Sequence, residues 1–310
     1  MPARILNGNL IAASIKTELT SEIAEMKSRG LVPGLAAVLV GENPASQIYV
    51  RSKVKTCETL GLYSDLIKLP ATASTDEILD LVGALNARNE IDGILVQLPL
   101  PPQVDAKKVL LALDPAKDVD GLHPLSAGNL MSGRPGMVPC TPAGIIQIID
   151  RSQIPIAGSR AVVIGRSEMV GKPAALLLLQ RNATVTLCHS QTVNIAAIAR
   201  EGDILIAAIG KPALVTWDFI KPGATVIDVG TTRLTKPEEV RAVFREPLEP
   251  LRQLAAKGAV LVGDVQPEDA REKAGAYTPV PGGVGPLTIA MLMSNTVRAA
   301  RLRRGGGLPS

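Results

Sequence analysis

A tyrosine and a lysine four residues apart are the first residues in this chain that could do chemistry together. Tyr49 and Lys53 would share one face of a helix, because residues at positions i and i+4 are neighbours on a helix surface. The pair would place an aromatic ring beside an amine that can exchange a proton. The chain has only 3 Tyr, 2 Phe and 1 Trp in 310 residues, so an aromatic side chain next to a lysine is uncommon in it. The plain alternative is a surface lysine beside a half-buried tyrosine.

The segment around this pair carries the signals of a complete helix. Asn43 can cap its amino end, Pro44 suits the first helical position, and Gly61 can end it. A buried strand is predicted just before it, at residues 35–40. We therefore expect Tyr49 and Lys53 on a helix that follows a strand directly.

Polar side chains follow a second apolar strand and occupy a later turn. Gln97 and Leu98 close the strand predicted at residues 93–98, and ligand sites lie outside the carboxyl ends of parallel strands. Asp118 and Asp120 place two carboxylates in one turn. Without a ligand, that turn would be a simple capping structure.

A strand, a glycine turn and a helix start follow one another in the second half of the chain. A strand predicted at residues 161–164 leads into Gly165, Arg166 and Ser167, and a helix is predicted over residues 170–180. In dinucleotide-binding domains this order holds a pyrophosphate through free backbone N–H groups. The pattern is imperfect, because the G-x-G-x-x-G fingerprint has a glycine where Ser167 stands.

The end of the next strand, predicted at residues 184–188, indicates which cofactor is bound. An NAD-binding domain usually carries an acidic residue there, whereas this chain has His189 and Ser190. No carboxylate would repel a 2′-phosphate, and Arg166 and Ser190 could bind it. The alternative is a solvent-exposed arginine and a turn serine. We predict NADP rather than NAD.

The composition is that of a globular protein with a large core. Of the 310 residues, 46% are hydrophobic and 20% are charged, and alternating helix and strand patterns predict an α/β fold with two α/β domains. The net charge of +4 is spread along the chain, which favours a mildly basic site for a polyanionic ligand over nucleic-acid binding. Because no membrane-spanning or signal segment is recognisable, we expect a cytoplasmic protein that does not bind membranes.

The chain has few residues that bind metals. Its three cysteines, Cys57, Cys140 and Cys188, lack metal-ligand spacing, and His123 and His189 complete no ligand set. We predict that the cysteines are small buried core residues and that there is no metal or disulfide.

Six short motifs occur in an order typical of one family. They are YVRSK, VQLPLP, KDVDG, PCTP, GRSEMVGKP and TPVPGGVGPLT. From about Asn7 to Arg298 the chain closely resembles the methylenetetrahydrofolate dehydrogenase/cyclohydrolase family. The resemblance implies NADP-dependent oxidation of 5,10-methylenetetrahydrofolate to the methenyl form and its hydrolysis to 10-formyltetrahydrofolate. It also implies a homodimer that works in one-carbon metabolism and purine biosynthesis, on folates that can carry polyglutamate.

The resemblance also implies the domain organisation. Residues 1–142 and 286–310 would form the catalytic, folate-binding domain, since the last helix returns to it in this family. Residues 143–285 would form a Rossmann-like NADP-binding domain, with a cleft between the two.

In the implied reaction, Lys53 is the general acid or base of the hydrolysis. It must be neutral to accept a proton, and burial beside a cationic intermediate favours the neutral amine. Gln97 would hold the amine by a hydrogen bond, and Tyr49 would stack on the folate ring. Asp120 would accept hydrogen bonds from the aminopyrimidine edge of the pterin. Asp118 would be a turn residue, with Lys117 as its partner.

The candidate residues form three sets. The catalytic set is Lys53, Gln97 and Tyr49. The substrate-binding set is Tyr49, Lys53, Gln97, Leu98, Asp120, Pro281, Gly282 and Gly283. The cofactor-binding set is Gly165, Arg166, Ser167, Ser190 and Thr231.

The sequence departs from the family after Gly230. Most relatives have an apolar residue and Asn there, whereas this chain reads Thr231, Thr232, Arg233. A longer charged stretch at residues 237–257 is predicted to be helical and solvated. The tail at residues 301–310 is predicted to be disordered.

Three other functions stay open at this point. The chain could be another NADP-dependent dehydrogenase of similar architecture, of the shikimate or amino-acid dehydrogenase kind, which would not require Tyr49, Lys53, Gln97 and Asp120 together. It could be a dehydrogenase without cyclohydrolase activity. It could also be a non-catalytic protein that binds NADP, although a binder has no need for a lysine with a positioned amide.

Overall fold

The computed structural model describes residues 2–305. The chain divides into two compact units. The first contains the residues up to Ala12 and Thr141–Thr288, and the second contains Ala13–Cys140 and the chain from Ile289 onward. Each unit has a parallel sheet with helices, so the predicted α/β fold with two α/β domains is confirmed.

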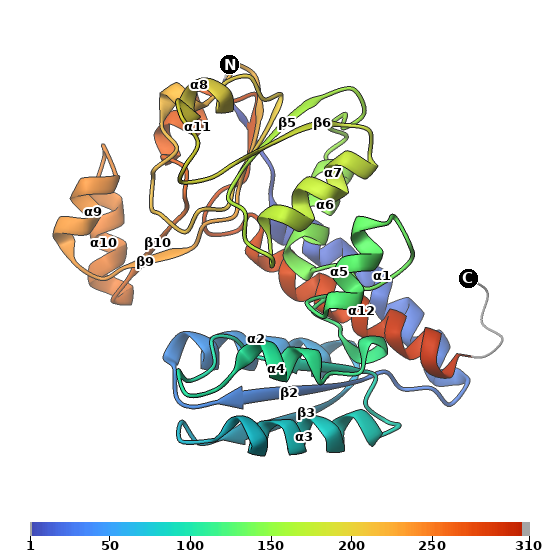
Figure 1. The fold of residues 1–310 in the computed structure, drawn as a ribbon. Coiled ribbons are helices and arrows are strands. Elements are labelled where there is room, and N and C mark those ends of the chain that lie inside the picture. Colours follow the sequence, from blue (N-terminus) through green and yellow to red (C-terminus); the bar gives the residue numbers. More distant parts are fainter. Residues whose placement is uncertain (1, 306–310) are drawn as a thin grey trace. The chain divides into compact units, whose positions relative to one another are not determined.

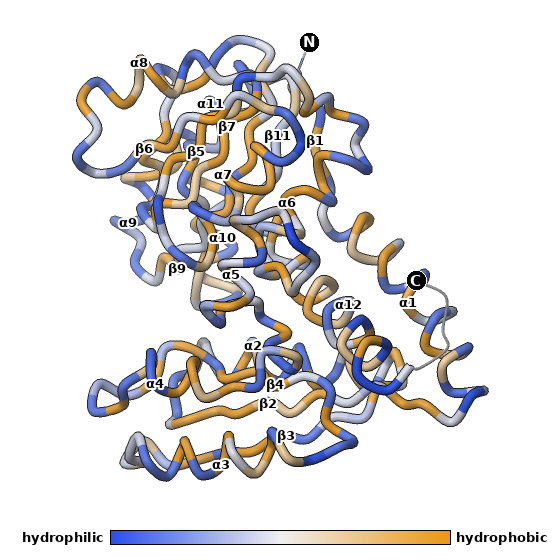
Figure 2. The backbone as a smooth tube through the Cα atoms, turned by 45° about the vertical axis from the view of Figure 1, so that its right-hand side comes forward, coloured by the Kyte–Doolittle hydropathy of each residue, from blue (hydrophilic) through white to orange (hydrophobic). Residues whose placement is uncertain are grey.

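The second unit contains a parallel sheet in the order β3-β2-β4. Its strands are β2 (Gly34–Val40), β3 (Tyr63–Leu69) and β4 (Gly93–Val96). Strand β2 is buried throughout and hydrophobic along its length (Figure 2). Helices α2 (Pro44–Leu60) and α3 (Thr75–Ala87) cover opposite faces of this sheet (Figure 1).

Helix α2 forms as predicted. Its first residue is Pro44, and the side-chain oxygen of Asn43 accepts a hydrogen bond from the Ser46 N–H at 3.1 Å. Gly61 follows its last residue with a φ of +78°, a conformation that glycine adopts without strain. The helix thereby begins and ends where the sequence predicts.

The remaining elements that reach into the second unit are helical. They are α1 (Gly8–Ser28), α4 (Ala106–Leu111), η1 (Pro115–Lys117), α5 (Pro124–Met131) and α12 (Gly285–Arg304). The division between the units falls inside α1 and α12.

The first unit contains a parallel sheet in the order β1-β11-β8-β7-β5-β6. The strands are β1 (Arg4–Ile5), β5 (Arg160–Ile164), β6 (Thr184–Cys188), β7 (Ile204–Ala207), β8 (Thr225–Asp228) and β11 (Ala276–Tyr277). Its helices are α6 (Cys140–Arg151), α7 (Gly171–Gln180), α8 (Ile195–Ala199), η2 (Trp217–Phe219) and α11 (Pro267–Lys273). Because the neighbouring strands are parallel, their carboxyl ends meet at one edge of the sheet.

The charged stretch forms a small insertion with a core of its own. Strands β9 (Thr232–Leu234) and β10 (Val260–Val262) pair in antiparallel fashion around helices α9 (Pro237–Val243) and α10 (Leu248–Lys257). The helices were predicted, but full solvation was wrong, because Leu234, Val240, Leu254, Val260 and Val262 are buried together. Strand β10 pairs with β9 and is not part of the parallel sheet.

Two expectations about the chain ends also need correction. The first residues were expected in the catalytic domain, but β1 pairs with β11, as in the register Arg4↔Ala276, so they belong to the first unit. Disorder of residues 301–310 was wrong for 301–304, because α12 continues to Arg304. Residues 306–310 lie outside the described part of the chain. Within residues 2–305, no helix has the length and apolar character needed to cross a membrane.

Candidate active site

The second unit brings Lys53 and Gln97 into direct contact. Lys53 lies on α2, its residue surface is only 8% exposed, and its Nζ donates a hydrogen bond to Gln97 Oε1 at 3.0 Å. Gln97 directly follows β4, and its backbone N–H bonds the Val38 carbonyl at 2.9 Å. Its Nε2 donates to the Leu98 carbonyl at 2.6 Å, which turns the amide oxygen toward the lysine. The amine is therefore held at the end of a buried strand.

Lys53 acts electrostatically on Asp120. Burial raises the pKa of Asp120, the positive charge of Lys53 opposes this rise, and the Asp118 carboxylate adds to it. The two side chains are therefore near enough for their charges to interact. The Cys140 thiol also lies there, with its Sγ 3.7 Å from Asp120 Oδ1 and 3.3 Å from the Val119 carbonyl.

Sequence reasoning missed Cys140 as part of this site. It was interpreted as one of three small buried residues, and all three cysteines are indeed buried free thiols. Burial, the Asp120 carboxylate and the hydrogen bond to it together raise the pKa of Cys140, although Lys53 opposes them. The thiol therefore donates a hydrogen bond here and does not form a thiolate. The PCTP motif was the available signal.

The turn that carries Asp120 is built around Asp118. The Asp118 carboxylate accepts hydrogen bonds from the Leu122 N–H, the His123 N–H and the Ser126 hydroxyl at 3.1, 2.8 and 2.7 Å. These contacts fix the start of α5, in agreement with a turn role for Asp118. They also hold the backbone next to Asp120.

Lys117 is not the partner of Asp118, contrary to the prediction. Its Nζ donates to the carbonyls of Leu85, Asn86 and Arg88 at 3.1, 2.7 and 2.7 Å. These carbonyls lie at the carboxyl end of α3, where a cation is favoured by the helix dipole. Lys117 therefore caps the carboxyl end of α3.

Tyr49 lies one helical turn before Lys53, and its residue surface is 47% exposed. Its ring is therefore available to a ligand. Leu98 is partly buried beside Gln97. All five predicted folate-binding residues outside the glycine loop thus belong to the second unit: Tyr49, Lys53, Gln97, Leu98 and Asp120.

In the first unit, the structure brings Arg166 and Ser190 to neighbouring strand ends. Ile164 of β5 is in register with Cys188 of β6, and the Gly165 N–H bonds the Cys188 carbonyl at 2.9 Å. Arg166 and Ser190 each follow two residues later, and both are exposed. A phosphate can reach both side chains from solvent.

Gly165 has a conformation and a packing that exclude other residues. Its φ is +123°, and a Cβ there would lie 2.1 Å from the Ala208 carbonyl oxygen. This close approach fits the glycine turn of a dinucleotide site.

One detail of that turn differs from the prediction. Ser167 Oγ accepts hydrogen bonds from the Val170 and Gly171 N–H groups at 3.2 and 3.3 Å, so these amides at the start of α7 are not free. Ser167 thereby shapes the turn, while Arg166 and Ser190 provide its exposed polar groups. This donor set fits a dinucleotide that carries a 2′-phosphate.

The other predicted residues of the first unit lie in loops. Thr231 is exposed just after β8. Gly282 has a φ of +100°, and its carbonyl accepts the Gly8 N–H at 2.8 Å. A Cβ on Gly283 would lie 2.6 Å from the Pro279 carbonyl oxygen, so this loop requires glycine. A position of Pro281, Gly282 and Gly283 beside the folate stays a prediction.

Two family models match most of the chain. Residues 6–120 match the tetrahydrofolate dehydrogenase/cyclohydrolase catalytic domain, and residues 139–304 match the NAD(P)-binding domain of the same family. The chain belongs to this family. It is therefore an enzyme with dehydrogenase and cyclohydrolase domains, as the motif order predicts.

Similar proteins extend over the full length of this tetrahydrofolate dehydrogenase/cyclohydrolase. The chain is 59% identical to the bifunctional protein FolD of Koribacter versatilis, covering 98% of this chain and 99% of the relative. The structure of the Campylobacter jejuni bifunctional enzyme FolD matches with a TM-score of 0.88 and 40% identity, covering 97% and 99% of the two chains. The Trypanosoma brucei FolD, solved with NADP and an inhibitor, has a TM-score of 0.88 and 38% identity, covering 99% and 100%.

Proposed function

We propose that this enzyme oxidises 5,10-methylenetetrahydrofolate with NADP and hydrolyses the methenyl product to 10-formyltetrahydrofolate. The observation that carries the proposal is the hydrogen bond from the buried Lys53 amine to Gln97, beside Asp120. A pure dehydrogenase would not need an amine and an amide in this arrangement. Membership of the family supports both activities.

For the oxidation, the residues of the chain bind and align the reactants. NADP, when bound, supplies the hydride acceptor. Arg166 and Ser190 bind its 2′-phosphate, since both are exposed at neighbouring strand ends. The NADP complex of the Trypanosoma brucei relative supports this choice of cofactor. Thr231 and Gly165 line the same carboxyl edge of the sheet.

For the hydrolysis, Lys53 moves the proton. The neutral amine accepts a proton from the water molecule that attacks the cationic methenyl carbon, and it returns this proton to the ring nitrogen as the bond between that nitrogen and the carbon breaks. The remaining hydroxyl proton of the adduct is released to solvent as the formyl carbonyl forms. Gln97 Oε1 orients the amine through the 3.0 Å hydrogen bond. Asp120 holds the pterin edge, and Tyr49 packs against the ring system.

The domains follow from these assignments. The folate site belongs to the second unit and the NADP site to the first, with residues 1–142 and 286–310 proposed as catalytic and 143–285 as cofactor-binding. Arg4 and Ile5 pair with β11 of the first unit, whereas the match to the catalytic domain begins at residue 6. By resemblance, the enzyme works as a cytoplasmic homodimer that supplies one-carbon units for purine biosynthesis.

A two-wavelength assay of the purified enzyme tests the proposal. The enzyme receives 5,10-methylenetetrahydrofolate with NADP or with NAD, and formation of the reduced nicotinamide is followed by absorbance. Hydrolysis is measured separately on 5,10-methenyltetrahydrofolate without any nucleotide. We expect oxidation that prefers NADP, and hydrolysis in the separate assay. Oxidation without hydrolysis would indicate a dehydrogenase-only enzyme, and the absence of both activities would refute the proposal.

A further inference from the structure

Two buried carboxylates lie at the carboxyl edge of the first unit's sheet. Asp228 ends β8, and Asp264 follows β10. Their residue surfaces are 5% and 0% exposed. Within residues 2–305, no lysine or arginine forms an ion pair with either one. Because buried charges without cations are costly, this pair needs a physical explanation.

Backbone amides take the place of a cation at Asp264. Its carboxylate accepts hydrogen bonds from three consecutive N–H groups, those of Ile209, Gly210 and Lys211, at 2.5, 2.9 and 2.8 Å. These residues follow β7 after one intervening residue, Ala208. Three convergent amides form the kind of concave site that binds anions. Here the anion is part of the protein, and it fixes the conformation of the loop.

The loop that Asp264 holds contacts the glycine turn of the cofactor site. Ala208 immediately precedes the three amides, and its carbonyl oxygen would lie 2.1 Å from a Cβ on Gly165. A shift of this loop would therefore change the packing of the turn that carries Arg166. In parallel sheets, the ends of adjacent strands at this edge form the ligand crevice.

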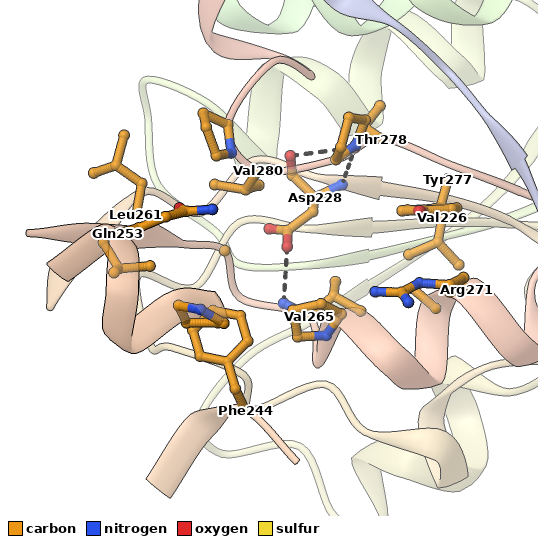
Figure 3. Close-up of a pocket in the computed structure, with 17 residues that line it drawn as sticks. Val226, Asp228, Phe244, Gln253, Leu261, Val265, Arg271, Tyr277, Thr278 and Val280 are labelled. Atoms are coloured by element: carbon orange, nitrogen blue, oxygen red, sulfur yellow. Dashed lines mark hydrogen bonds between the residues drawn. The ribbon is translucent and has the colours of Figure 1, made fainter. Parts of the chain in front are cut away.

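Asp228 extends the same network to the next strand. Its carboxylate accepts the N–H groups of Gly230, Asp264 and Val265 at 2.9, 2.8 and 3.0 Å. Its backbone N–H bonds Thr278 Oγ1 at 2.8 Å (Figure 3). Asp228 thereby holds the backbone of Asp264 in place. It also binds Gly230, which precedes Thr231, and Thr278, which precedes the glycine loop.

Packing leaves little freedom around the two carboxylates. A Cβ on Gly230 would lie 2.4 Å from Asp264 Oδ1, and a Cβ on Gly263 would lie 1.8 Å from Asp228 Oδ2. On its other side, Asp228 borders a cavity of about 250 Å³ that Phe244 and Leu261 of the insertion help to line (Figure 3). The two carboxylates are thus closely packed against Gly230 and Gly263, and Asp228 also borders this cavity.

We propose that Asp264 is a positioning residue for the dehydrogenase reaction, fixing the loops after β7 and β8 so that they present a rigid surface to the nicotinamide end of the cofactor. This inference rests on the proposed function. Asp264 acts only through the backbone, and Asp228 supports it. The proposed catalytic residues Lys53 and Gln97 belong to the other unit, so we expect a change at Asp264 to affect hydrolysis much less than oxidation.

The test compares Asp264→Asn with Asp203→Asn. Asparagine keeps the size of Asp264 but offers one acceptor oxygen to three amides. Asp203 is the matched control, because its carboxylate also accepts a backbone N–H, that of Arg160 at 2.9 Å, but at the amino edge of the same sheet. For each variant, kcat and KM are measured for both activities, and NADP affinity is measured by calorimetry.

We expect Asp264→Asn to raise KM and Kd for NADP and to lower dehydrogenase kcat/KM by about tenfold or more, with hydrolysis within about twofold of the wild type. Asp203→Asn should leave the ratio of the two activities unchanged. Equal loss of both activities in Asp264→Asn, or unchanged NADP affinity, would overturn the inference. A wild type without dehydrogenase activity would instead refute the proposed function.

Gly210→Ala keeps the inference testable if Asp264→Asn does not fold. Gly210 has a φ of +74°, which alanine disfavours, but its added Cβ would meet no atom within 4 Å. This variant should fold and displace the loop from Asp264. We expect the same selective rise in KM for NADP, and normal NADP affinity would refute the role of the loop.

Discussion

Replacing Lys53 by methionine should abolish most of the hydrolysis while the protein stays folded. General acid–base help by a positioned side chain contributes about 10²- to 10⁴-fold, so hydrolysis of methenyltetrahydrofolate should fall by that factor. Methionine fills the space of the lysine stem, which matters because the residue surface is only 8% exposed. The substitution leaves Gln97 Oε1 without this hydrogen bond, which costs about 1–3 kcal/mol of stability, less than the about 5–15 kcal/mol of a typical domain.

The assay follows the absorbance of 5,10-methenyltetrahydrofolate as it is hydrolysed. Lys55→Met is the matched control, since Lys55 lies two residues further along α2 and is exposed. It should hydrolyse the substrate like the wild type. Folate affinity of Lys53→Met, measured by calorimetry, should stay within a few fold of the wild type, because methionine keeps the apolar stem of the lysine and removes only the amine.

Hydrolysis by Lys53→Met at a rate within about threefold of the wild type would remove Lys53 from the mechanism, since loss of a general base should lower the rate by about 10²-fold or more. Loss of folate binding together with hydrolysis would instead assign Lys53 to substrate binding. A parallel loss in Lys55→Met would show that the effect comes from the helix and not from the amine.

Three further results are expected. Arg166→Ala should weaken NADP binding by about 1.5–3 kcal/mol in calorimetry and weaken NAD much less, and equal losses would contradict 2′-phosphate binding. Asp120→Ala and Asp120→Asn should each lower kcat/KM of both activities by roughly 10- to 100-fold, whereas loss of a single activity would favour a turn role. Burial raises the pKa of Asp228 from 3.8 to about 7, so the folded state keeps a proton that the unfolded state loses between these values. Stability should therefore fall by at most about 1.4 kcal/mol per pH unit as the pH rises from 4 to 7. Asp228→Asn should flatten this slope in urea unfolding followed by the fluorescence of Trp217, the single tryptophan.

Local signals explain why a helix carrying Tyr49 and Lys53 could be predicted from the sequence, whereas folate binding there rests on the family resemblance and stays a prediction. A cap, a proline and a terminal glycine define α2 and place Tyr49 and Lys53 one turn apart. Gln97 follows a short apolar strand, and parallel pairing of β2 with β4 brings its end to the helix that leaves β2. Each signal lies within about twenty residues, where periodicity and capping are informative.

The residues that sequence reasoning missed depend on contacts distant in the chain. Lys117 binds carbonyls about thirty residues away, where no pattern in its own turn could indicate the partner. The insertion shows helical periodicity, but its core forms only when β9 and β10 pair across two helices. Asp264 likewise holds amides 53 to 55 residues earlier in the chain.

The distribution of charge in the two units predicts that mutations can separate the two activities. At the proposed folate site, the charges belong to the side chains of Lys53 and Asp120, so we expect a substitution there to act on the groups that react with or bind the substrate. At the cofactor edge, Asp228 and Asp264 are engaged by six backbone N–H groups, and a substitution there acts on loop geometry. Loss of a reacting group should lower kcat, whereas a displaced loop should mainly raise KM for the cofactor. The kinetic split between kcat and KM therefore distinguishes the two kinds of residue without any structure of the variants.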